Sequence, residues 1–208
     1  MIPVASSETL QAASAWLSAH DRLLAPVIAR VGDCTLRPHR NYYQELVQSI
    51  LGQQLSLKAA AAIEARFVAL FEGVFPAPDM ILSKSPEDLR SAGLSRAKAL
   101  YVQDLARHVL DGRIRFDDID SLSNDEIIRE FTAVKGIGEW TVHMFLIFCM
   151  GRLDVLPVGD LGIKNGLRLI YSLPAQPTPQ EVASIALANN WHPYESVASW
   201  YTWQALTL

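Results

Sequence analysis

The chain has 208 residues, 50% of them hydrophobic, with a formal net charge of -4. This length can hold one domain or two small ones with ample core. The acidic balance, with a pI of about 5.7, argues against a protein that coats DNA through overall positive charge. Only two cysteines occur, and no uncharged run approaches the ~20 residues of a membrane span. We therefore expect a soluble protein of a reducing, cytoplasmic compartment.

Helical spacing and helix-start signals predict an all-α chain. Residues 6–31 form one predicted helix, capped by Ser6 or Ser7 and with a break near Pro26. A stripe of apolar residues from Asn41 predicts a second helix that ends at 52–54. An alanine-rich helix over 58–72 follows, then a turn marked by Pro76 and Pro78. Two further helices are predicted at 86–92 and 96–111.

In the second half, Ser123 or Asn124 begins a helix that leads to the turn Gly136-Ile137-Gly138. The next helix is predicted over 139–150 and is apolar on nearly every side after its first turn. A loop then ends at Asp160, where another helix begins. Helices at about 179–189 and at the aromatic C-terminal segment complete the chain.

The glycine turn has two interpretations. A tight turn leading straight into a helix leaves amide groups unpaired, and a phosphate can accept hydrogen bonds from them. Such a contact reads the DNA backbone and not its sequence. The alternative is an ordinary helix stop with glycine past the end.

The residues after the turn carry similar alternatives. Trp140 and Met144 lie four residues apart, and they either belong to the core or line a pocket. Asp160 stands at a helix start, in line with Lys164 and Arg168. It is either a functional carboxylate or a plain N-cap with surface charges beyond it.

Several sequence motifs occur in order along the chain. They are ILGQQLS at 50–56, GLSRAKA at 93–99, GIGEWT at 136–141, LPVGDLGIKNG at 156–166 and WHPYESVASWYTW at 191–203. Together they resemble one known family, the helix-hairpin-helix, Gly/Pro-Asp (HhH-GPD) superfamily of DNA glycosylases, and within it the DNA-3-methyladenine glycosylase II branch. The resemblance covers nearly the whole chain.

The resemblance implies a fold of two helical lobes with the active-site cleft between them. Residues 42–152 would form a helical barrel lobe containing the hairpin, and 1–41 plus 153–208 a second lobe carrying the catalytic loop. The N-terminal β domain of some relatives is expected to be absent.

The resemblance also implies roles for individual residues. Asp160 would be catalytic, and Gln54 would be the wedge pushed into the duplex, where some relatives have leucine. The base pocket would be lined by Gln53, Trp140, Met144 and Trp203, whereas Trp200 is assigned to the core. The DNA backbone would be contacted by Lys135, Gly136, Gly138, Lys164, Arg96 and Lys98. On residue grounds alone, the favoured interpretation of Gln53 and Gln54 is solvation. For Arg96 and Lys98, a solvated face and a phosphate contact are equally compatible with the sequence.

The implied function is a monofunctional glycosylase of base excision repair, acting as a monomer on double-stranded DNA with alkylated purines such as 3-methyladenine or 7-methylguanine. Lyase relatives place a lysine where this chain has Trp140, so no lyase activity is expected. The alternatives are a non-catalytic damaged-DNA binder and a glycosylase for deaminated or mispaired bases.

The sequence predicts no iron–sulfur cluster and no zinc site, and no cofactor is expected to be required. Two cysteines cannot supply the four that the iron–sulfur members use. The histidines show no zinc spacing. The family hairpin also coordinates a monovalent cation, Na⁺ or K⁺, through main-chain carbonyls. Here those would be the carbonyls of Thr132, Val134 and Ile137.

Overall fold

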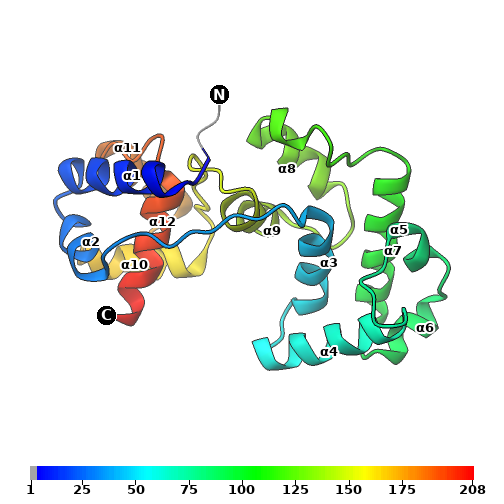
Figure 1. Cartoon of the computed structure of the whole chain (residues 1–208). Coiled ribbons are helices and arrows are strands. Elements are labelled where there is room, and N and C mark those ends of the chain that lie inside the picture. Colours follow the sequence, from blue (N-terminus) through cyan, green and yellow to red (C-terminus); the bar gives the residue numbers. More distant parts are fainter. Residues whose placement is uncertain (1–3) are drawn as a thin grey trace. The chain divides into compact units, whose positions relative to one another are not determined.

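The computed structural model describes residues 4–208, which form helices joined by turns (Figure 1). Within this range, extended pairing is limited to one isolated antiparallel bridge between Val4 and Arg152. The all-α prediction is therefore confirmed. None of the helices in the described range has both the length and the apolar character needed to cross a membrane.

The chain divides into two compact units. Asn41–Phe145 form one, which we call the hairpin unit. Met1–Arg40 and Leu146–Leu208 form the other, the aspartate unit. The predicted lobe boundary lies at 152, seven residues beyond Phe145, the last residue of the hairpin unit. Residues 146–152 belong with the aspartate unit because Cys149 accepts a hydrogen bond from the His39 amide through its carbonyl.

The hairpin unit is built around α7. Its helices are α3 (Tyr42–Gly52), α4 (Leu57–Ala69), α5 (Pro78–Leu82), α6 (Pro86–Ser91), α7 (Arg96–Leu110), α8 (Asn124–Thr132) and α9 (Glu139–Met144), with a 3₁₀ turn η1 (Ile119–Ser121). The long α7 packs against α3, α5 and α6 (Figure 1). The short α5 lies where the prolines had predicted only a turn, and Pro78 occupies its first position, where no amide is needed.

The aspartate unit packs α12 at its centre. Its helices are α1 (Ser7–His20), α2 (Ala25–Val31), α10 (Leu161–Ile170), α11 (Pro179–Ala188) and α12 (Glu195–Gln204), with the 3₁₀ turn η3 (Ala205–Thr207). Helix α12 contacts α1, α2 and α10. Nearly all its residues are buried, including Trp200, so the assignment of Trp200 to the core is confirmed.

The single helix predicted over 6–31 is wrong in one respect. It is two helices that break at Asp21 and not at Pro26. The Asp21 carboxylate accepts hydrogen bonds from the Leu23 and Leu24 amides, so it supplies the local bonds that end α1 and start α2. Pro26 lies in the first turn of α2, where its missing amide costs nothing.

The predicted helix over 139–150 is also only partly regular. It is α-helical as far as Met144 and then becomes a π-helical segment, η2 (Phe145–Cys149). Two of its carbonyls bond outside the helix. That of Leu146 accepts the Arg152 amide at 2.9 Å, and that of Cys149, at the end of η2, accepts the His39 amide at 2.9 Å. At the other predicted starts, Ser6 and Ser123 are the observed N-caps.

Candidate active site

The turn between α8 and α9 requires glycine at only one of its two positions. Gly136 has a φ of +86°, and a Cβ there would lie 2.2 Å from the Tyr101 ring. Gly138 has ordinary φ, and a Cβ there would meet nothing within 4 Å. Ile137 between them is 4% exposed and anchors the turn in the core, as its spacing predicts. The turn is thus fixed from inside at Gly136 and open to the outside at Gly138.

A cavity of about 390 Å³ opens beside this turn. Its volume falls within the ~300–1,000 Å³ typical of small-molecule sites. Three of the four predicted base-pocket residues, Gln53, Trp140 and Met144, line it together with Gln54. Trp140 is 55% exposed, so it is a pocket wall and not core.

The two glutamines differ in their surroundings. The Gln53 side-chain amide donates to the Gly136 carbonyl at 2.7 Å, which ties the pocket to the turn. Gln54 is exposed and has a φ of +59°, a left-handed conformation that residues with a Cβ rarely adopt. Such strain in an exposed residue at a pocket rim is typical of functional positions.

The predicted phosphate contacts differ in their surroundings. Arg96 and Lys135 are exposed, and Lys164 is half-buried. Lys98 has a different placement, because its ammonium donates to the carbonyls of Leu51 and Gln53, at 2.7 Å each. It therefore holds the carbonyl end of α3, and its partial burial lowers the pKa of its amine.

Asp160 lies in the aspartate unit, where it caps α10. It is 8% exposed, and its Oδ1 accepts the Ile163 amide at 2.7 Å. The same oxygen accepts the indole N–H of Trp203 at 2.8 Å. The N-cap interpretation of Asp160 is thus correct. The Trp203 bond fixes the carboxylate further than a cap requires.

Two residues that sequence reasoning missed complete this arrangement. Phe148 stacks on Trp203 with ring centroids 5.6 Å apart and planes inclined by 28°. A Cβ at Gly162 would lie 2.7 Å from the Trp203 ring and 3.0 Å from Asp160 Oδ1, so glycine there allows the indole to reach the carboxylate. The sequence held a signal for Gly162, which lies within a helix where glycine is disfavoured. Phe148 gave no signal in an apolar run.

The predicted site residues therefore fall into two groups, each within one unit. Gln53, Gln54, Trp140 and Met144 share the cavity of the hairpin unit. Asp160 and Trp203 contact each other in the aspartate unit. Among residues 4–208, no group of three or more His, Cys, Asp or Glu side chains is arranged to hold a metal ion.

This hairpin, pocket and buried aspartate define a class of protein, and comparison with known families gives the same result. The model of the HhH-GPD superfamily of base excision DNA repair proteins matches residues 47–191. The chain belongs to this superfamily, and both the family resemblance and the all-α class of the HhH-GPD fold are confirmed.

Individual relatives are similar over most of their length. DNA-3-methyladenine glycosylase 1 of Schizosaccharomyces pombe is 36% identical over 207 residues, which is 96% of this chain and 89% of the relative. A crystal structure of a DNA-3-methyladenine glycosidase from Bacillus halodurans has a TM-score of 0.82 at 38% identity, covering 91% of this chain and 86% of that one. The structure of the Schizosaccharomyces pombe 3-methyladenine DNA glycosylase in complex with abasic DNA has a TM-score of 0.80 at 36% identity. It covers 94% of this chain and 97% of that one.

Proposed function

We propose that the protein is a DNA glycosylase that removes alkylated purines from double-stranded DNA, hydrolysing the N-glycosidic bond and leaving the strand uncut. The observation that carries this proposal is the buried Asp160 carboxylate, whose Oδ1 is held by two N–H donors. A pure DNA-binding module has no use for a carboxylate held in this way, since a negative charge repels phosphate.

The pocket of the hairpin unit supports a flipped, alkylated base as ligand. A base in duplex cannot present its glycosidic bond to a side chain, so it must leave the stack at a cost of a few kcal/mol. A purine alkylated at N3 or N7 is cationic, and the exposed Trp140 ring attracts a cation over its face. The amide of Gln53, a pocket wall, is the group able to hydrogen-bond a base edge.

Asp160 supplies the electrostatic part of the reaction. As the glycosidic bond stretches, positive charge builds on the sugar, as in glycoside hydrolysis. A carboxylate held in place before the reaction stabilises that charge without reorganising. It also serves to orient the attacking water or accept its proton. The Trp203 and Ile163 hydrogen bonds hold it in that orientation.

Trp140 defines the reaction type. Backbone cleavage by lyase members requires a lysine amine at this position to form a Schiff base with the sugar. An indole provides no such nucleophile. The released product is therefore a free base, and the DNA product is an intact strand with an abasic site.

We also propose that the hairpin binds a monovalent cation through main-chain carbonyls. Carbonyl oxygens are the ligand type that hard cations prefer. The Thr132 hydroxyl donates to the Ile128 carbonyl at 2.6 Å, so it does not compete with the Thr132 carbonyl. The Val134 carbonyl accepts one amide, that of Ile137 at 3.1 Å, and a carbonyl has two lone pairs. These carbonyls fit Na⁺ or K⁺, which would stiffen the turn.

The test compares base release from methylated duplex DNA by the wild type, Asp160→Asn and Asp117→Asn, with products resolved by chromatography. Asp117 is an exposed loop residue, so it controls for the charge change. We expect the wild type and Asp117→Asn to free alkylated purines without strand nicks, and Asp160→Asn to bind the same DNA without releasing them.

A different pattern would support one of the rival functions. Binding of damaged duplex by all three proteins with no base release by any would indicate a non-catalytic damage reader. Release of hypoxanthine or a mispaired base in place of methylated purines would indicate the alternative glycosylase. Gel filtration with light scattering tests the expected monomer in the same samples.

A further inference from the structure

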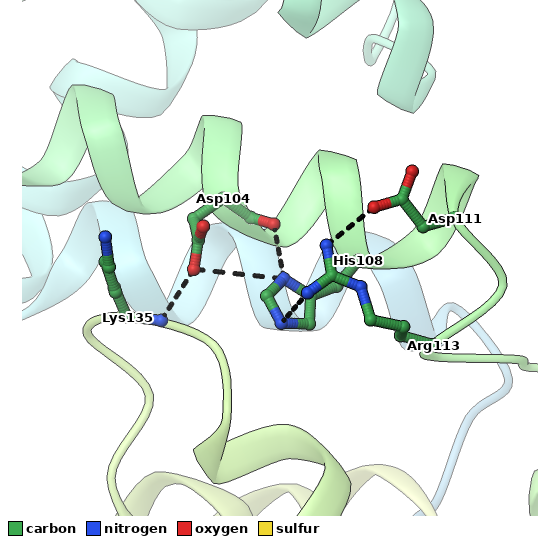
Figure 2. A network of polar contacts seen from close by, with 5 residues as sticks. All are labelled: Asp104, His108, Asp111, Arg113 and Lys135. Atoms are coloured by element: carbon green, nitrogen blue, oxygen red, sulfur yellow. Dashed lines mark hydrogen bonds and ion pairs between the residues drawn. The ribbon is translucent and has the colours of Figure 1, made fainter.

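A polar network in the hairpin unit connects α7 to the turn between α8 and α9 (Figure 2). Asp104 of α7 points its side chain at the loop that precedes Gly136. Its Oδ2 accepts the main-chain amide of Lys135 at 2.9 Å. This bond joins α7 to the turn.

The network continues from Asp104 along α7. His108 contacts the Asp104 main-chain carbonyl through Nδ1 at 2.9 Å, and Arg113 Nη1 lies 3.1 Å from His108 Nε2. A guanidinium can only donate, so Nε2 accepts and the ring proton lies on Nδ1. Arg113 in turn forms an ion pair with Asp111 at 2.6 Å, as Figure 2 shows.

Burial decreases along this network. The His108 side chain is 7% exposed and that of Asp104 18%, whereas those of Asp111 and Arg113 are more than half exposed. The bond to Lys135 lies at the surface on the Lys135 side, whereas the Asp104 carboxylate that accepts it is largely buried. Of the bonds in this network, it is the one that contacts the turn, and the outer pair is peripheral.

The same face of α7 supports the turn at a second point. Tyr101, three residues before Asp104, packs its ring against Gly136 so closely that no Cβ fits there. One helix thus fixes two successive residues of the turn, one by packing and one by a hydrogen bond. Because the bond of Asp104 is to a main-chain amide, it depends on the shape of the turn and not on the lysine side chain.

We propose that Asp104 is a positioning residue for DNA binding, holding the Lys135 amide so that the turn keeps the shape with which it binds a DNA backbone. This inference rests on the proposed function. The direction in which DNA affinity changes when Asp104 is replaced distinguishes this role from a purely electrostatic effect. Removing a carboxylate near a polyanion should strengthen binding if charge alone matters, whereas removing the tether should weaken it.

The experiment measures the affinity of the wild type, Asp104→Ala, Asp104→Asn and Asp111→Asn for a duplex with a tetrahydrofuran abasic-site analogue. The single-turnover rate of base release is measured at saturating protein. Asn at 104 keeps an oxygen that can accept the Lys135 amide, and Asp111→Asn is matched in charge on the adjoining surface.

We expect Asp104→Ala to bind roughly tenfold more weakly, equivalent to one hydrogen bond to a charged group. Asp104→Asn and Asp111→Asn should bind as tightly as the wild type or more tightly, and the saturated single-turnover rate should be unchanged in all. Faster hydrogen exchange at the Lys135 amide of Asp104→Ala, measured well below its melting temperature, should accompany the loss. General destabilisation would not confine the change to that amide.

Three results would overturn the inference. The first is equal affinity of Asp104→Ala and Asp111→Asn. The second is failure of Asp104→Asn to restore binding, and the third is a fall in the saturated rate with unchanged affinity. If the wild type itself neither binds this duplex nor releases a base, the proposed function fails instead, and the outcome is distinct from all three.

Discussion

At the scale of single residues, Asp160 combines two roles that the sequence presented as alternatives. It caps α10, and the same oxygen accepts the Trp203 indole. An N-cap residue is already held by the helix that it starts. Because the proposed catalytic carboxylate of Asp160 is also an N-cap, the helix holds it in a fixed position. The Trp203 indole adds a second constraint on its orientation.

Gly162→Ala should impair catalysis more than binding. Its Cβ would lie within 3 Å of the Trp203 ring, so the indole must move away from Asp160. We expect a roughly tenfold or greater fall in the single-turnover rate, consistent with loss of one hydrogen bond to a charged group. Affinity for abasic duplex should change little.

The matched control for this variant is Gly159→Ala, whose Cβ would meet nothing within 4 Å. It should behave as the wild type in both assays. Circular dichroism should show Gly162→Ala folded, since alanine favours a helix interior by about 1 kcal/mol over glycine. An unchanged rate would mean that the indole bond does not hold the carboxylate for catalysis.

At the scale of elements, α7 joins the parts of the hairpin unit that form the site. Lys98 at its start holds the carbonyl end of α3, and Tyr101 and Asp104 hold the turn. Gln53 then links α3 to the turn through the Gly136 carbonyl. The pocket rim and the turn are thus supported by one helix face.

Lys98→Met should lower stability without changing the salt dependence of DNA binding, because its ammonium already donates to Leu51 and Gln53. Two lost hydrogen bonds to a charged donor predict a loss of roughly 2–4 kcal/mol. This is measured by chemical denaturation. Log affinity against log salt concentration then gives the number of phosphate contacts.

Arg96→Met is the comparison, since Arg96 is exposed at the start of the same helix. If it contacts phosphate, the salt slope should fall by about one while stability is unchanged. A reduced salt slope for Lys98→Met would instead show that its ammonium leaves the carbonyls to bind DNA.

At the scale of the whole molecule, stability should depend on pH through a few buried groups. Burial lowers the pKa of His143 below its ordinary 6.5. The unfolded chain then binds that proton more tightly, so stability falls as pH drops below 6.5. Burial raises the pKa of the Cys34 thiol from 9.0 to about 11. Stability present below pH 9 is therefore lost as pH rises towards 11.

We expect the free energy of unfolding to be level between about pH 6.5 and 9 and to fall on both sides. Urea titrations across this range measure it. His143→Gln should reduce the decline just below pH 6.5, and Cys34→Ser should reduce the one between about pH 9 and 11, where the shift of the thiol represents roughly 2–3 kcal/mol. Burial also raises the pKa values of Tyr43, Tyr171 and Tyr201, so a decline above pH 10 should remain in Cys34→Ser. Unchanged slopes in either variant would assign the effect to other groups.

The acid side has a second, lower step. Hydrogen bonds at capping boxes lower the pKa values of the carboxyls of Asp88, Glu126 and Glu181. A lowered pKa in the folded state contributes stability that is present above the unfolded value and lost as pH falls through the folded one. This step lies below the model-peptide values of 3.8 to 4.5, separate from that of His143.

Much of the fold was predictable because its causes are local. Serine caps at Ser6 and Ser123 begin helices through bonds to amides three residues away, so the sequence shows them directly. The break was misplaced at Pro26 although the bonds of Asp21 to the Leu23 and Leu24 amides are local. The further bond of Asp21 to the Trp191 indole, 170 residues away, is invisible in a local pattern.

The sequence by itself determined the class of the protein: an all-α chain with a glycine turn, a tryptophan where lyase relatives have a lysine, and an aspartate at a helix start. These depend on residue type and spacing along the chain. Only the tertiary structure decided that the side chain of Lys98 binds main-chain carbonyls and that of Asp104 a main-chain amide. It also decided that Gly162, which has no Cβ, leaves space for the Trp203 indole to reach Asp160. Those roles depend on which segments meet in space, because a hydrogen bond or a Cβ clash acts over about 3 Å whatever the separation in sequence.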